Sequence, residues 1–223
     1  MVEVFASILA ANVLDLAREV IKAEELGVNG LHVDIMDGHY VCNFGFGPQF
    51  IHSLKRLTSL PVEAHLEVEH GDSFVDLFIG CGSDIITLHP ESCRKLEESL
   101  QKIKKSGVKS GLAVSPRLSL DLVDRYLSLV DRLLIMTVPP GFGGQRLCEN
   151  TLPVIAEAKL RINKLGLQVT VAADGGINLD NVLRVIESGA DTLVMGTALF
   201  QNPNVGKLME LIKGSSGQSV PGK

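Results

Sequence analysis

Short apolar runs alternate with longer amphipathic segments along most of the chain. Each run is six to eight residues long, and most are continuously apolar instead of alternating between apolar and polar positions. Runs of this kind are typical of parallel strands that are buried on both faces of a sheet. The predicted strands are VFASIL (4–9), GLHVDIM (30–36), PVEAHLEV (61–68), DIITLH (84–89), KSGLAV (109–114), RLLIMTV (132–138), VTVAAD (169–174) and DTLVMG (191–196).

The segments between these runs carry apolar residues at helical spacing, and most end in glycine. The clearest has Asn12 placed to cap its start and Gly27 placed to end it. A strand followed by a helix, repeated about eight times, favours the α/β class and a single (β/α)8 TIM barrel over an open, doubly wound sheet. We expect residues 1–213 to form the barrel and residues 214–223 to form a flexible C-terminal tail. The expected helices lie within 12–27, 93–107, 150–166, 178–190 and 202–214.

Composition narrows the functional classes. The chain has 223 residues and a net charge of −5, and its acidic and basic residues are mixed along the sequence. We therefore expect no nucleic-acid partner and no membrane partner. The four cysteines are widely spaced without a C-x-x-C motif, which disfavours a cysteine zinc site and fits a reducing compartment. Because the sequence shows no basic leader and no membrane-length apolar run, a cytoplasmic location is expected.

Histidines and aspartates collect toward the carboxyl ends of three predicted strands. His32 and Asp34 lie on the second, His65 on the third, and Asp174 ends the seventh. Barrel enzymes carry their chemistry at this end, and residues two apart on a strand face the same side. Two imidazoles and two carboxylates suit one divalent metal ion, with zinc first and iron, manganese or cobalt as alternatives. Either histidine alone is more typical of a hydrogen-bonded core residue, but the four together favour the metal site.

Other residues near these strands have weaker claims to function. Asp37 lies in the turn sequence MDGH, so it either supports the turn or orients a metal ligand. The role of His39 stays open, and His89, which precedes a proline, is expected to be structural. From position alone, Met36 and Met136 are expected to fill the core, with an apolar wall beside a ligand as the alternative.

Glycine-rich loops follow the last three predicted strands, in the sequences PPGFGGQ, DGGIN and MGTALF. Glycine lets backbone amides approach a ligand closely, and barrels commonly bind phosphate on the loops after strands seven and eight. Gly176, Gly196 and Thr197 are placed for this role, with Gly143 and Gly144 facing them. Because Arg146, directly after PPGFGGQ, is the only lysine or arginine at these motifs, amides and helix N-termini would carry most of the phosphate charge.

Five longer motifs stand in a fixed order along the chain: HVDIMDGHYVCNFGFGP, EAHLEV, IMTVPPGFGGQ, ADGGIN and MGTALF. In this order and spacing they resemble the ribulose-phosphate 3-epimerase family. The resemblance runs from ASILAAN to ALFQ, nearly the whole predicted barrel. It implies a metal-dependent isomerase of the pentose phosphate pathway that interconverts ribulose 5-phosphate and xylulose 5-phosphate through an enediolate. It also implies a homo-oligomer, with a homodimer as the first expectation.

The resemblance implies roles for particular residues. Asp34 and Asp174 match the paired catalytic acid and base, which inversion at C3 requires on opposite faces of a planar intermediate. The matching metal ligands are His32, Asp34, His65 and Asp174. The residues that match contacts with the small sugar-phosphate substrate are Ser7, Met36, His65, Met136, Gly141, Phe142, Gly143, Gly144, Gly175, Gly176, Gly196 and Thr197.

The chain also departs from the family pattern, above all at Glu67, where the family has a third active-site methionine. A carboxylate beside an anionic intermediate is unfavourable unless it turns away, binds the metal or meets a different substrate. An epimerase of another ketose phosphate, of the allulose 6-phosphate type, therefore stays an alternative, as does a non-catalytic sugar-phosphate binding protein. A related barrel decarboxylase is disfavoured, because Met36 replaces the lysine of its Asp-x-Lys-x-x-Asp pattern.

Overall fold

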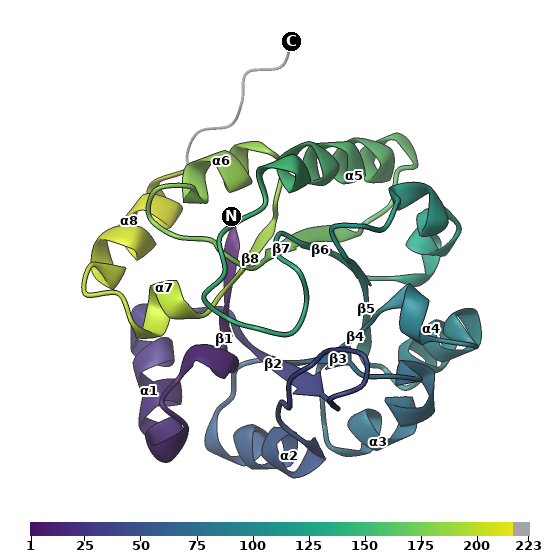
Figure 1. Ribbon diagram of the computed structural model, residues 1–223, viewed down its shortest axis with the longest axis horizontal. Helices are drawn as coiled ribbons and strands as arrows, with labels where there is room; N and C mark the ends of the chain where they lie inside the picture. The colour runs from purple at the N-terminus through teal and green to yellow at the C-terminus, as the bar shows by residue number, and fades with distance from the viewer. Residues whose placement is uncertain (216–223) are drawn as a thin grey trace.

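The computed structural model, which describes residues 1–215, contains a closed barrel of parallel strands (Figure 1). Each strand pairs with the next in sequence, and β8 pairs with β1. This closure confirms the predicted (β/α)8 fold and excludes the open sheet. The strands are β1 Glu3–Ser7, β2 Gly30–Met36, β3 Val62–Glu67, β4 Ile85–Leu88, β5 Lys109–Val114, β6 Arg132–Met136, β7 Thr170–Asp174 and β8 Thr192–Met195.

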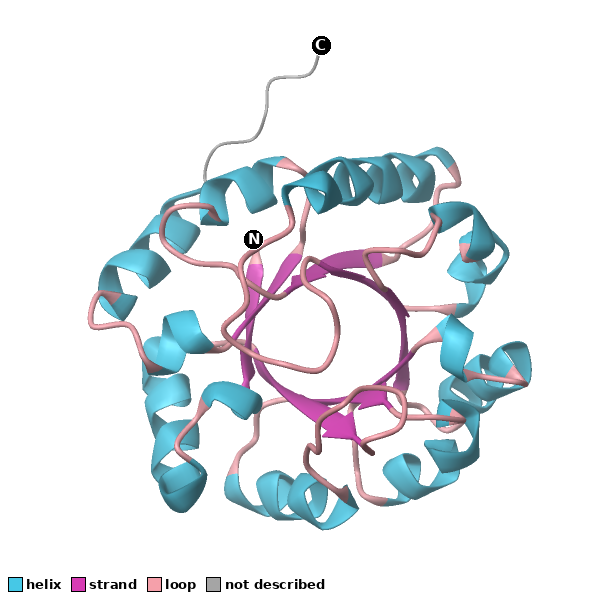
Figure 2. Cartoon of the chain, in the orientation of Figure 1, coloured by secondary structure: helices cyan, strands magenta, loops and turns pink. Residues whose placement is uncertain are grey.

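Helices form a ring around the barrel (Figure 2). After β5 the chain forms two 3-10 helices, Leu120–Leu122 and Asp124–Leu129, in place of an α-helix. Within residues 1–215, no helix is both long and apolar enough to cross a lipid bilayer. The α-helices are α1 Leu16–Leu26, α2 Pro48–Leu57, α3 Val75–Gly80, α4 Leu96–Lys105, α5 Leu152–Lys164, α6 Val182–Glu187, α7 Thr197–Phe200 and α8 Val205–Ser215.

The ends of the first predicted helix follow from its capping residues. The Asn12 side chain accepts a hydrogen bond from the Leu14 backbone N–H at 3.1 Å, where a 3-10 turn leads into α1. Gly27 ends α1 at φ +78°, in the left-handed region that favours glycine. At the other end of the chain, α8 includes Gly214 and Ser215. The remainder of the predicted tail, 216–223, lies outside the described residues.

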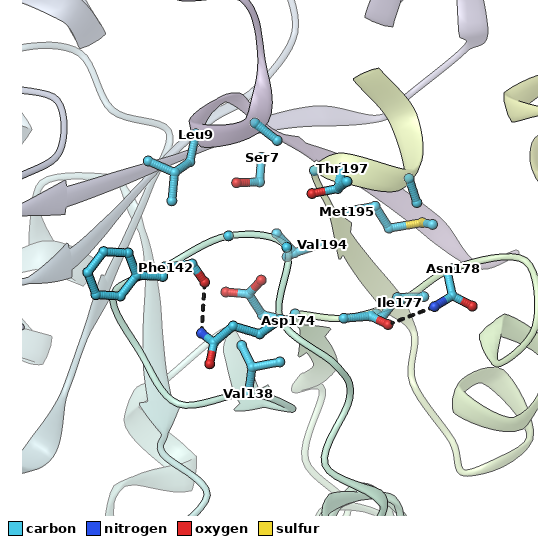
Figure 3. Close-up of a pocket in the computed structure, with 18 of the residues that line it drawn as sticks. Ser7, Leu9, Val138, Phe142, Asp174, Ile177, Asn178, Val194, Met195 and Thr197 are labelled. Atoms are coloured by element: carbon cyan, nitrogen blue, oxygen red, sulfur yellow. Dashed lines mark hydrogen bonds between the residues drawn. The ribbon is translucent and has the colours of Figure 1, made fainter. Parts of the chain in front are cut away.

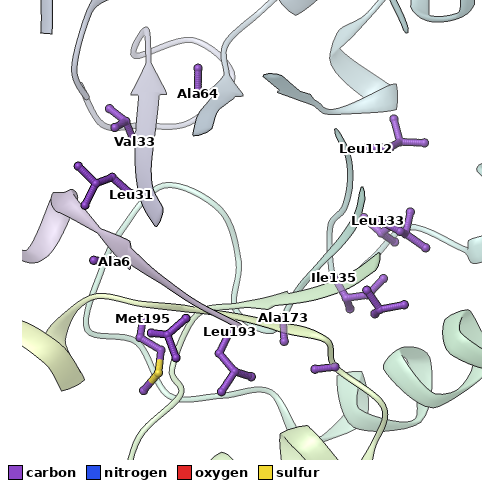
Figure 4. Packing of buried hydrophobic residues seen from close by; sticks show 14 of the residues in the cluster. Ala6, Leu31, Val33, Ala64, Leu112, Leu133, Ile135, Ala173, Leu193 and Met195 are labelled. Carbon is purple, nitrogen blue, oxygen red and sulfur yellow. The ribbon is translucent and has the colours of Figure 1, made fainter. Parts of the chain in front are cut away.

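Side chains alternate between the two faces of each strand, and this alternation positions the site. On β2, Leu31, Val33 and Ile35 pack outward with the helices in the main hydrophobic core, which continues on the neighbouring strands (Figure 4). His32 and Asp34 lie between them in sequence and therefore face the barrel interior. A smaller apolar cluster fills part of that interior and consists of Phe5, Ile85, Ala113, Leu134, Met136, Ala172 and Val194.

Candidate active site

Four side chains from three strands meet inside the barrel, near the carboxyl ends of the strands. His32 Nε2 lies 3.1 Å from His65 Nδ1 and 3.2 Å from Asp34 Oδ1. Asp174 Oδ2 lies 3.6 Å from His32 Nε2 and 3.8 Å from His65 Nδ1. All four side chains are buried. The residues predicted as metal ligands therefore form one cluster that could hold a metal ion.

Glu63, which the sequence analysis did not single out, orients the His32 ring. Its Oε2 lies 3.1 Å from His32 Nδ1 and accepts a hydrogen bond from Arg132 at 2.7 Å, while its Oε1 accepts one from Thr87 at 2.6 Å. Burial alone would raise the pKa of Glu63, but the Arg132 guanidinium holds it well below its usual range. The carboxylate therefore accepts a hydrogen bond from His32 Nδ1–H, and whenever the ring is neutral its Nε2 presents a lone pair to the cluster.

A second chain of hydrogen bonds fixes the other imidazole. The Tyr40 hydroxyl donates to Glu91 at 2.9 Å, so its oxygen accepts from His89 Nδ1 at 2.8 Å. His89 Nε2 is then the acceptor for His65 Nε2–H, 2.9 Å away. This leaves the lone pair of His65 Nδ1 directed toward the cluster. His89, expected to be structural, thus contacts a predicted metal ligand, with its ring stacked on that of His65 at 5.0 Å between centroids.

The donor set fits a divalent ion. With these tautomers, two imidazole lone pairs and two carboxylate oxygens face one another without a proton between them, an arrangement that a cation would stabilise. Ligands held about 2.0–2.1 Å from one zinc ion in a tetrahedron lie about 3.3 Å from one another. The two histidine nitrogens lie 3.1 Å from each other and 3.2 to 3.8 Å from the carboxylate oxygens, and all four donor atoms lie within 4.8 Å of one another. His32, Asp34, His65 and Asp174 are therefore the residues that could hold such an ion.

Electrostatics separates the two aspartates. Without a metal ion, burial would lower the pKa of His32, but the charges of Asp34, Glu63 and Asp174 raise it, so His32 Nε2 then carries a proton toward Asp34. Burial would raise the pKa of Asp34, but the charge and hydrogen bond of this protonated His32 hold it well below its usual range. Burial, together with the charges of Asp34 and Glu63, raises the pKa of Asp174 to about 7, although His32 opposes the shift. Ser7 Oγ donates a further hydrogen bond to Asp34 Oδ2 at 3.1 Å. Two carboxyl groups with different proton affinities thus share one site.

A cavity of about 500 Å³ opens above the cluster (Figure 3). Asp174 directs its carboxylate into the cavity, and Ser7 and Thr197 lie above it in this view. Every residue predicted to contact substrate lines the cavity except His65, which belongs to the buried cluster. Those that line it are Ser7, Met36, Met136, Gly141, Phe142, Gly143, Gly144, Gly175, Gly176, Gly196 and Thr197.

The predicted phosphate loops form the side of this cavity next to β7 and β8. Gly175 and Gly176 have φ values of +109° and +69°, which side chains with a Cβ rarely adopt. A Cβ on Gly176 would also lie 2.4 Å from the Leu147 backbone nitrogen, so only glycine fits against the loop after β6. Gly196 immediately precedes the short helix α7, which begins at Thr197. The backbone in these loops can thus approach a ligand without intervening side chains.

The loop after β6 crosses the mouth of the barrel in Figure 1. Its ends are joined by a hydrogen bond of 2.7 Å from Cys148 N–H to the Thr137 carbonyl oxygen. The Gln145 side chain spans the loop by donating to the carbonyl oxygens of Pro139 and Phe142. Asn43, in the loop after β2, donates to the Gly141 carbonyl oxygen at 2.7 Å. The loops after β2 and β6 are therefore tied to one another over the cavity.

The open question about Asp37 resolves in favour of the turn. Its Oδ1 accepts hydrogen bonds from the backbone N–H groups of His39 and Tyr40, at 2.8 and 3.0 Å. Its Oδ2 accepts one from the backbone N–H of Glu69 at 2.8 Å, which joins the loops after β2 and β3. The side chain of Asp37 thus supports two loops, and it makes no hydrogen bond to any of the four cluster residues.

Comparison with known proteins places the chain in a family. The model of the Ribulose-phosphate 3 epimerase family matches residues 3–200. The ribulose-phosphate 3-epimerase of Bacillus subtilis is 36% identical over 216 residues, covering 96% of this chain and 100% of that protein. The enzyme of the same name from Escherichia coli K12 is 36% identical over 205 residues, and the alignment covers 92% of this chain and 91% of the Escherichia coli protein.

Solved structures of lower sequence identity share the fold. A mutant form of the tryptophan synthase alpha-subunit of Pyrococcus furiosus aligns with a TM-score of 0.68 at 12% identity, covering 96% of this chain and 97% of that chain. The thiamine phosphate pyrophosphorylase of the same organism aligns with a TM-score of 0.64 at 18% identity, covering 97% and 96%.

The closed barrel makes this chain a (β/α)8 protein, and its candidate site lies at the carboxyl end of the strands. The chain belongs to the ribulose-phosphate 3-epimerase family and is an isomerase of that type.

Proposed function

We propose that this protein is a metal-dependent 3-epimerase of a phosphorylated ketose that interconverts ribulose 5-phosphate and xylulose 5-phosphate. The names of the relatives support this substrate pair. The observation that carries the mechanism is the pair of carboxyl groups from β2 and β7, Asp34 and Asp174, placed around one donor cluster at the base of the cavity. A cytoplasmic location and a homodimer remain predictions from the sequence.

Epimerisation at C3 needs one group that removes the proton next to the carbonyl and a second that returns a proton to the opposite face. Asp34 on β2 and Asp174 on β7 are the two carboxyl groups placed for this: one accepts the proton while the other donates one, and the two exchange roles in the reverse reaction. Ser7 holds Asp34 in position through its hydrogen bond to Oδ2.

The metal site supports this chemistry. A divalent ion held by His32, Asp34, His65 and Asp174 would place positive charge beside the developing negative charge of the enediolate, and zinc is our first choice of metal. Met36 and Met136 are buried residues that line the cavity. They provide an apolar wall that excludes water from the reacting carbons. The glycine loops after β7 and β8 would hold the phosphate and so fix the sugar above the aspartates.

The experiment that tests this function is an assay of the metal-loaded protein with several ketose phosphates in deuterium oxide. We expect ribulose 5-phosphate to be converted to xylulose 5-phosphate with solvent deuterium at C3. If exchange at C3 occurs with no ketose phosphate, the epimerase function is wrong. If it occurs only with a six-carbon ketose phosphate, the reaction stands and the substrate assignment changes.

A further inference from the structure

Glu67 is an acidic residue with no assigned role inside the candidate site. It is the last residue of β3, lies two positions after His65, and lines the cavity. The residue is only 1% exposed, and its Oε2 atom is buried without a hydrogen-bond partner. Leaving such an atom unpaired is unfavourable, so a buried carboxyl oxygen in a binding cavity calls for a partner that the free protein lacks.

The surrounding protein does not supply that partner. The backbone of Gly141 makes a hydrogen bond to the Glu67 carboxyl group, which leaves its second oxygen unpaired. Among the described residues that line the cavity there is no lysine or arginine to pair with it. The neighbouring charges of Asp34 and Asp174 are repulsive to a carboxylate at this position. Glu67 also lies close to His65 and His89, but the facing nitrogens of these two rings hydrogen-bond to each other. A neutral polar group on the ligand is a partner that meets no repulsion here.

The position of Glu67 in the barrel indicates which part of a ligand it meets. In a closed barrel of eight strands in sequential order, β3 lies opposite β7, the strand that leads into Gly175 and Gly176. A ketose whose phosphate lies on the loops after β7 and β8, and whose C3 lies over the aspartates, extends its unphosphorylated end toward β3. That end of the molecule carries the C1 hydroxyl group next to the carbonyl.

We propose that Glu67 is a specificity-determining residue that hydrogen-bonds to the C1 hydroxyl group of the ketose phosphate. This inference rests on the proposed function, because it takes its ligand from there. Glu67 Oε2 gains its missing partner when substrate binds, and a ligand that lacks the hydroxyl leaves this oxygen buried and unpaired. Sites built to hydrogen-bond a hydroxyl group discriminate against analogues without it far more strongly than apolar sites do. The methionine that the family resemblance leads us to expect at this position offers only a weakly accepting sulfur atom.

The test compares ribulose 5-phosphate with its 1-deoxy analogue in the wild-type protein, Glu67→Met and Glu67→Gln. For each protein, calorimetry gives the two dissociation constants, and deuterium exchange at C3 gives the two values of kcat/KM. We expect the wild-type protein to favour the parent compound at least tenfold by both measures and Glu67→Met to favour it less than threefold. Glu67→Gln, which can still hydrogen-bond to a hydroxyl, should keep an intermediate preference.

Glu69→Met is the matched control, because it makes the same change two residues later on an exposed side chain and should keep the wild-type preference. Thermal unfolding separates specificity from a structural role: Glu67→Met should unfold at the same temperature as the wild-type protein or higher, whereas a structural role predicts a lower one. An unchanged preference in Glu67→Met overturns the inference. If no compound undergoes exchange, the proposed function fails, and the ratio of dissociation constants still decides whether Glu67 contacts the C1 hydroxyl. If neither compound binds, both proposals fail.

Discussion

His89 Nε2 lies 2.9 Å from His65 Nε2, and the two rings stack at an interplanar angle of 19°. This contact joins a proposed metal ligand to the chain that continues through Tyr40 to Glu91. Partners of this kind set the tautomer of a ligand histidine, and their loss typically weakens metal binding by about 10- to 100-fold. We expect His89→Leu to lower metal affinity within that range, measured by competition with a chelator. Tyr40→Phe, one step further out, should have a smaller effect, and equal affinities in all three proteins would contradict the proposed orientation.

The same histidine should make stability depend on pH in the metal-free protein. Burial lowers the pKa of His89 from 6.5 to about 4, so between these values the unfolded chain binds a proton that the folded protein excludes. Stability is therefore lost as the pH falls through this range, by roughly 3 kcal/mol in total for a shift of about 2.5 units. Urea unfolding with a chelator present should show this loss in the wild-type protein relative to His89→Leu. Parallel pH profiles for the two proteins would disprove it.

The two aspartates should both be required for turnover. Asp34→Asn and Asp174→Asn each remove one proton-transfer group and one proposed metal ligand. We therefore expect activity to fall by about 10²- to 10⁴-fold or more. Far-ultraviolet circular dichroism should show that the fold is kept, and metal analysis should report how much ion each variant retains. Substantial activity in either variant, at wild-type metal content, would show that its carboxyl group does not transfer the proton.

Gly176 should be required for the shape of the phosphate loop. An alanine there combines a φ of +69° with a Cβ placed 2.4 Å from the Leu147 backbone nitrogen. We expect Gly176→Ala to lower the thermal unfolding temperature and to raise KM for a sugar phosphate several-fold, since the backbone must move away from the ligand. Gly143→Ala is the control for stability, because a Cβ at Gly143 meets nothing within 4 Å. Equal unfolding temperatures for the two variants would contradict this account.

The strands could be predicted from sequence because burial on both faces makes them apolar and short. Two predicted strands, 30–36 and 109–114, coincide with β2 and β5. The predicted segment 132–138 is too long: β6 ends at Met136, since the Thr137 carbonyl oxygen accepts its hydrogen bond from Cys148 N–H in the loop after β6. No sequence pattern distinguishes this change of hydrogen-bond partner at Thr137 from a continued strand.

The four cluster residues could also be found from sequence, because alternation along β2, β3 and β7 places them on one face at one end of the barrel. The residues that orient them were harder to find. Glu63 left a weak signal, since it stands two positions before His65 and so faces the same side of β3. His89 left none, because its role depends on the packing of its ring against a neighbouring strand. The unpaired state of Glu67 Oε2 likewise appears only when every neighbour is placed.

The buried ion pair between Arg132 and Glu63 has a consequence for how this barrel can evolve. Losing one partner of such a pair costs about 3–5 kcal/mol, a large part of a total stability of about 5–15 kcal/mol. Neither position can therefore drift alone, and among relatives we expect the two to change together. Because Glu63 also holds His32, a substitution at the start of β6 would disturb the orientation of a proposed metal ligand on β2. The residues that must be kept for this site to work therefore include Arg132, which lies at the opposite end of the barrel.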